Sequence, residues 1–203
     1  MVRQRLLELQ WRQLNHDELY HREIARLTVG DRMKHMALHL AKYAGQIAEA
    51  DEREDQSARQ QHLVDCFIIS LAAANTVSLD VGRGLDEQLA GSGTLQDLGI
   101  GLVRRGTRER SNADTFLRGL TIAVGKLAKA CESLDHVEAF AFRERMQQAV
   151  TEVFLAVIAE AARCGIDLEQ ASVTRQDAVR GRHLFDAFLR PTFDAATSQT
   201  SRS

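Results

Sequence analysis

The stretch His62–Asp80, HLVDCFIISLAAANTVSLD, decides the fold of this chain. Its apolar residues are distributed nearly all round the helix, which is typical of a helix that is buried on most of its sides. One acid, Asp65, lies well inside the stretch. A buried carboxylate is costly unless a cation or hydrogen bonds compensate its charge. The nature of the partner of Asp65 is therefore the main question about function.

A second stretch, Val153–Asp167 (VFLAVIAEAARCGID), follows the same pattern. An offset of 87 residues matches Phe67 with Phe154 and Asp80 with Asp167. Upstream, an offset of 80 matches LAKYAGQIAEA (40–50) with LTIAVGKLAKA (120–130). The sequence therefore predicts two related helical hairpins in one chain.

Composition limits the class of protein. The 203 residues are 44% hydrophobic, which is enough for a sizeable core without disulfides, and a single proline with few alternating β-branched runs favours helix throughout. The net charge of −2 and 5% aromatic content argue against a nucleic-acid surface. Without an apolar run of about 18 residues no membrane span is predicted. The cysteines occur singly and no signal peptide is evident, so we expect a cytoplasmic protein.

The predicted organisation follows the two hairpins. Residues 1–90 are expected to hold an N-terminal helix and the first hairpin, and residues 91–110 a glycine-rich connection. Residues 111–190 should hold the second hairpin and a helix over about Arg175–Leu189 that ends before Pro191, and residues 191–203 a disordered polar tail. The expected fold is an all-α bundle in which the hairpins are related by a pseudo-twofold axis and flanked by the remaining helices.

AGQIAEA, a loop and HLVDCFIISLAAANTVSLDV together resemble the MazG-like, all-α NTP pyrophosphohydrolase superfamily, which includes dimeric dUTPases and dCTP pyrophosphatases. Its first helix typically reads EEVGELAEA and its second ELADVLLYLLALANRLGIDL. The likeness covers about Asp31–Val81 and, more faintly, Asp114–Glu169, and Asn75 fits it well. The resemblance implies a helical cleft that holds a nucleotide.

In that family an ExxE and an ExxD motif hold Mg²⁺ against the phosphates. The corresponding positions here are Tyr43, Gln46, His62 and Asp65 in the first half and Ala123, Lys126, Ala149 and Glu152 in the second. One acid of four remains in each half. The resemblance therefore implies the fold, whereas the family's standard Mg²⁺ site is not expected.

Two partners for the remaining acids stay open. A rebuilt metal site would use His39, His62 and Asp65, with His35 one turn away, and would take Zn²⁺, Mn²⁺ or Fe²⁺ more readily than Mg²⁺. The preferred alternative is a pair of structural ion pairs, in which lysine replaces the metal. In these, Lys42 would face Asp65 and Lys126 would face Glu152.

Three hypotheses for function follow. The preferred one is a catalytically degenerate protein, regulatory or ligand-binding, that holds a nucleotide or other anion through the old cleft, with candidate contacts from Lys42, Tyr43, Gln46, Asn75, Lys126 and Glu152. The second is an active nucleoside triphosphate pyrophosphohydrolase in which Asp65 is catalytic. The third is a helical interaction module, for which an exposed helix face would allow a homodimer. No nucleic-acid or membrane partner is expected.

Overall fold

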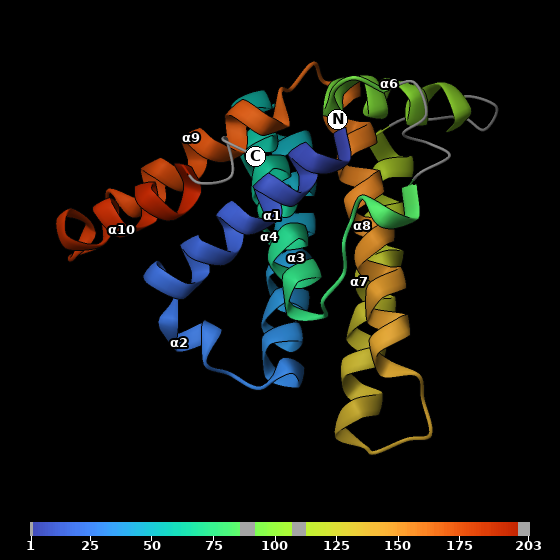
Figure 1. Ribbon diagram of the computed structural model, residues 1–203. Helices are drawn as coiled ribbons and strands as arrows, with labels where there is room; N and C mark the ends of the chain where they lie inside the picture. Colours follow the sequence, from blue (N-terminus) through green and yellow to red (C-terminus); the bar gives the residue numbers. More distant parts are fainter. Residues whose placement is uncertain (1, 86–91, 107–112, 199–203) are drawn as a thin grey trace.

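The computed structural model describes residues 2–85, 92–106 and 113–198 (Figure 1). The elements are α1 (Val2–Tyr20), α2 (Arg22–Ala25), α3 (Val29–Glu52), α4 (Gln56–Thr76), η1 (Arg83–Leu85), α6 (Leu95–Gly106), α7 (Ala113–Asp135), α8 (Phe142–Arg163), α9 (Leu168–Arg180) and α10 (Asp186–Ser198). Within these ranges there is no strand, so the prediction of an all-α protein is confirmed. None of the described helices is both long and apolar enough to cross a membrane.

Four long helices form the central bundle. α3 packs against α4 and α7 against α8, which gives two hairpins, and the hairpins meet through α3 on α7 and α4 on α8 (Figure 1). Phe67 of α4 and Phe154 of α8 stack with ring centroids 6.0 Å apart, and both side chains are fully buried. The apolar stretch that begins at His62 is therefore a central helix.

The two inner helices end in the same kind of turn. After α4, Ser78 has a φ of 54°, and after α8, Gly165 has a φ of 69°. In each case the next residue's amide donates to the carbonyl five residues before it, at 2.8 Å and 2.9 Å respectively. This is the Schellman arrangement, which satisfies carbonyls that a helix end leaves without partners. Ser78 and Gly165 differ by the 87 residues of the sequence offset.

The remaining helices cover the sides of the bundle. α1 and α9 pack on α4, α6 packs on α8, and α10 packs on α1. The prediction of a connection at 91–110 is wrong where α6 lies, although residues 91 and 107–110 fall outside the described ranges. A Cβ on Gly99 would come within 2.5 Å of the Ala162 Cβ, so this glycine lets α6 approach α8 closely.

The C-terminal region also differs from the prediction. Instead of one helix over 175–189, α9 ends at Arg180 and α10 continues through Pro191 to Ser198. The predicted disordered tail is thus wrong up to Ser198, and residues 199–203 lie outside the described ranges. Phe193 explains the extra helix: it is fully buried, with the guanidinium groups of Arg12 and Arg180 at 4.9 Å and 4.2 Å from its ring centroid. Burying a phenylalanine offsets the helical hydrogen bond lost at proline.

Candidate functional site

The buried acid of the first hairpin has a partner on α9. Arg175 donates from Nε to Asp65 Oδ1 at 2.7 Å and from Nη2 to Oδ2 at 3.0 Å. The hydrogen bonds that Arg175 donates to Asp65 raise the pKa of Arg175 above its ordinary value. Both carboxylate oxygens are used, in the bidentate geometry that a guanidinium fits best. The charge of Asp65 is therefore compensated within the chain.

The prediction that Lys42 pairs with Asp65 is wrong. Lys42 is exposed, and its Nζ lies over the Tyr43 ring at 4.1 Å from the centroid. The physical reason is the position of α9, which lies on α4 and brings Arg175 directly to the carboxylate.

The alternative of a rebuilt metal site at His39, His62 and Asp65 finds no support in the geometry. The described residues include no group of three or more His, Cys, Asp or Glu side chains that could hold a metal ion. Instead the rings form a row along α3 and α4, with centroid distances of 4.4 Å for His35–His39, 5.9 Å for His39–Tyr43 and 6.0 Å for Tyr43–His62. Burial lowers the pKa of His39 to about 4, and burial and Asp65 raise the pKa of Tyr43 to about 12. Near pH 7 both groups are neutral, as packing requires.

The other two candidates in this half have different surroundings. Asn75 exchanges two hydrogen bonds with Gln10 of α1: its Nδ2 donates to the Gln10 carbonyl at 2.8 Å, and its Oδ1 accepts from Gln10 Nε2 at 3.1 Å. Its amide therefore joins α4 to α1 and is not free for a ligand. Gln46 is partly buried, and its Oε1 has no hydrogen-bond partner among the described residues. With Arg175 in place, both oxygens of the Asp65 carboxylate are occupied.

The second hairpin retains an ion pair at the corresponding place. Lys126 Nζ lies 2.7 Å from Glu152 Oε2, so the predicted contact between these two side chains is confirmed. The side chains are 55% and 45% exposed. Exposed pairs of this kind contribute little to stability because water screens them. The pair is therefore available for exchange with another anion.

A pocket of about 390 Å³ opens at this pair. It is lined by Lys126 and Lys129 of α7, by Phe140 of the loop, and by Arg145, Gln148, Ala149 and Glu152 of α8. Three of the four positions that the sequence resemblance singled out in this half, Lys126, Ala149 and Glu152, lie in its wall. The fourth, Ala123, is buried and is not part of the wall.

The charges of this pocket are predominantly positive. Its wall carries three cations and one carboxylate. Lys129 is shared with two acids outside the wall, Glu132 at 2.9 Å and Glu138 at 3.4 Å. Arg145 donates to the amide oxygen of Gln148 at 3.2 Å, an uncharged partner. Beside these cations lies the half-buried ring of Phe140, so the pocket offers groups that suit an anion joined to a flat ring.

Four residues of the pocket wall, Lys129, Phe140, Arg145 and Gln148, were not among the sequence candidates. Lys129 lies three positions after Lys126 and Arg145 lies four before Ala149, so helical spacing from the aligned positions was a signal for both. No comparable signal identified Phe140, because it lies in a loop.

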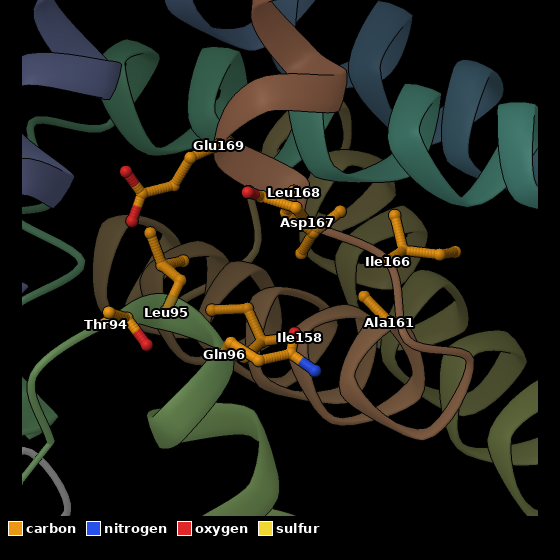
Figure 2. Close-up of a pocket in the computed structure, with 9 residues that line it drawn as sticks. All are labelled: Thr94, Leu95, Gln96, Ile158, Ala161, Ile166, Asp167, Leu168 and Glu169. Atoms are coloured by element: carbon orange, nitrogen blue, oxygen red, sulfur yellow. The ribbon is translucent and has the colours of Figure 1, made fainter.

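A second pocket of about 220 Å³ lies where α6 begins beside the α8–α9 junction (Figure 2). Figure 2 shows its apolar side chains, Leu95, Ile158, Ala161, Ile166 and Leu168, together with the polar Thr94, Gln96, Asp167 and Glu169. Both acids are already engaged: Glu169 accepts from Arg5 at 2.6 Å, and Asp167 caps α9 by accepting from the Gln170 amide at 3.1 Å. We interpret this hollow as part of the packing between helices.

Comparisons of the chain with protein-family models, with curated proteins and with solved structures find no significant match. The assignment of function therefore depends on the geometry of the α7–α8 pocket.

Proposed function

We propose that the protein is a catalytically degenerate MazG-like protein that binds a nucleotide, or another phosphorylated anion, in the α7–α8 pocket. The observation that carries the proposal is the grouping of Lys126, Lys129 and Arg145 with Phe140 around one hollow. The cations would contact phosphate oxygens, and the ring would stack on a base. The role would be binding or regulation.

Two features support a pseudo-twofold relation between the hairpins, as in a dimer of single hairpins. Residues related by a twofold axis meet each other where the axis passes between two equivalent helices. Phe67 and Phe154, which the sequence offset matches, stack at the α4–α8 contact. The left-handed residues Ser78 and Gly165, at the same offset, end the two helices alike.

The pairing of the remaining acids favours binding over hydrolysis. Mg²⁺ sites that hydrolyse nucleotides need several carboxylates whose oxygens are free to coordinate the metal. Here both oxygens of Asp65 accept from Arg175, and both oxygens of Glu152 accept from Lys126. The positive charge that a metal supplies in the family would come from side chains in this chain. Because Glu152 is exposed, a phosphate group could replace it beside Lys126 at little cost.

The test is a panel of nucleoside mono-, di- and triphosphates and pyrophosphate, with Mg²⁺ or Mn²⁺ and without metal. We expect thermal stabilisation of the protein without pyrophosphate release. Arg145→Gln and Lys129→Gln should each weaken binding about tenfold, as expected for one charge-assisted hydrogen bond. Arg118→Gln, an exposed change on α7 outside the pocket, is the matched control and should leave affinity unchanged.

Two outcomes would contradict the proposal. Turnover of a triphosphate that disappears in Asp65→Asn would identify an active pyrophosphohydrolase. A chain that no member of the panel stabilises would be better described as a helical interaction module.

A further inference from the structure

α10 presents its apolar side to solvent. Leu184 and Phe185, just before the helix, and Phe188 within it are 85%, 55% and 81% exposed. Phe193 is the one described residue of α10 that is buried. In Figure 1 the helix extends away from the central bundle beside α1. A cluster of large exposed apolar side chains of this kind marks an interaction surface.

The exposed residues form one stripe. One face of α10 carries Phe188, Pro191, Thr192 and Ala195 at the i, i+3, i+4, i+7 spacing of a helix. Leu184 and Phe185 precede this face in the turn before the helix, and all six residues are exposed. We call them the α10 stripe.

The charged side chains of α10 lie off this stripe and are engaged within the chain. Asp186 accepts from the Tyr20 hydroxyl at 3.0 Å and pairs with Arg190, and Asp194 lies 3.5 Å from Arg180. The usual amphipathic arrangement is thus inverted, with the apolar side outward.

We infer that the α10 stripe binds the same stripe of a second copy, antiparallel and about a twofold axis. The stripe is graded in size, with Leu184, Phe185 and Phe188 at its start and Thr192 and Ala195 at its end. An antiparallel pair places the large end of one copy on the small end of the other. Phe185 then lies over Ala195 and Phe188 over Thr192, each at two equivalent places, so the surface is complementary to itself.

The available area fits a weak dimer. With about 200 Å² for a phenylalanine side chain, the exposed fractions of the three large residues leave roughly 400 Å² per copy to bury. A standard stable interface buries about 800 Å² per partner, and weak complexes bury less than about 600 Å². The association should therefore be weak and should depend on protein concentration.

The charges favour a protein surface over an anionic membrane. Basic residues near a lipid surface attract it by about 1 kcal/mol each, so binding needs several free bases. Beside the stripe, Arg190 is committed to Asp186 and Arg180 to Asp177 and Asp194. The exposed Arg182 has no ion pair among the described residues, and a single base is too few for such binding. The stripe thus lacks a strong basic border.

The test is sedimentation velocity of the full chain from about 1 to 300 µM. We expect a monomer–dimer equilibrium that Phe188→Glu weakens at least tenfold, because the change places two carboxylates in the contact. Leu38→Glu on α3, 71% exposed in the free chain, is the matched control and should leave the equilibrium unchanged. Circular dichroism melting will show that each variant is folded.

Three results would overturn the inference. The first is a wild-type chain that stays monomeric throughout the range, and the second is a dimer that Phe188→Glu leaves intact. The third is a monomer that binds phosphatidylserine vesicles through Phe188, which would assign the stripe to a membrane surface.

Discussion

Replacing Arg175 by Met should be among the most damaging changes in the protein. It removes the guanidinium from Asp65 and keeps most of the apolar stem. The Asp65 side chain is only 8% exposed, so its carboxylate would stay buried without a cation. Breaking a buried pair in this way costs about 3–5 kcal/mol. Because Arg175 is 22% exposed and water can partly replace it, we expect the lower end, about 3 kcal/mol. For a chain of this size that lowers Tm by about 9 °C.

The design includes variants that separate the buried charge from general damage. Asp65→Asn should cost less than Arg175→Met, about 1–2 kcal/mol, because the guanidinium left behind can reach solvent. Combining the two should cost less than the sum, since no buried charge remains. Lys42→Met is the matched control: its contact is with the Tyr43 ring, so we expect a loss below about 1 kcal/mol.

Urea unfolding at pH 7, followed by circular dichroism, measures the free energy of unfolding of the wild type and of these four variants. If Lys42→Met were as costly as Arg175→Met, Lys42 would be the partner of Asp65 and the assignment of the pair would fail. A loss below about 1 kcal/mol for Arg175→Met would equally refute it.

Other changes test the packing between helices. Arg59→Met should cost about 3 kcal/mol in urea unfolding, because this 3% exposed guanidinium joins α4 to a buried carboxylate of α8. Gly99→Ala should lower Tm, since the new Cβ would lie 2.5 Å from a side-chain carbon of α8, whereas Gly101→Ala, with open space, should not. The free energy of unfolding should fall as pH drops from about 6.5 to about 4, because in this range His39 is protonated in the unfolded chain but stays neutral in the folded one. In His39→Phe the free energy of unfolding should depend less on pH over the same range.

Local patterns predicted the central hairpins because each helix is decided by its own residues. The apolar run around Phe67 and the glycine at 165 identify a buried helix and a helix end. Composition gave wrong predictions for glycine and proline, because each can lie inside a helix as well as in a connection or at a helix end. Glycines suggested a connection at 91–110, but Gly99 serves close packing against α8. Pro191 suggested a helix end, but the burial of Phe193 outweighs it.

The two acids show where sequence reasoning reached its limit. The partner of Glu152 lies on the neighbouring helix of the same hairpin, and the hairpin pattern was sufficient to predict Lys126. The partner of Asp65 lies 110 residues away on a flanking helix that carries no motif. The need for a cation followed from burial, but its identity depended on α9 lying over α4. The same placement explains the difference between the hairpins: Arg175 occupies the carboxylate of the first, whereas the second keeps its cations around a surface pocket, and there we expect an anion to bind.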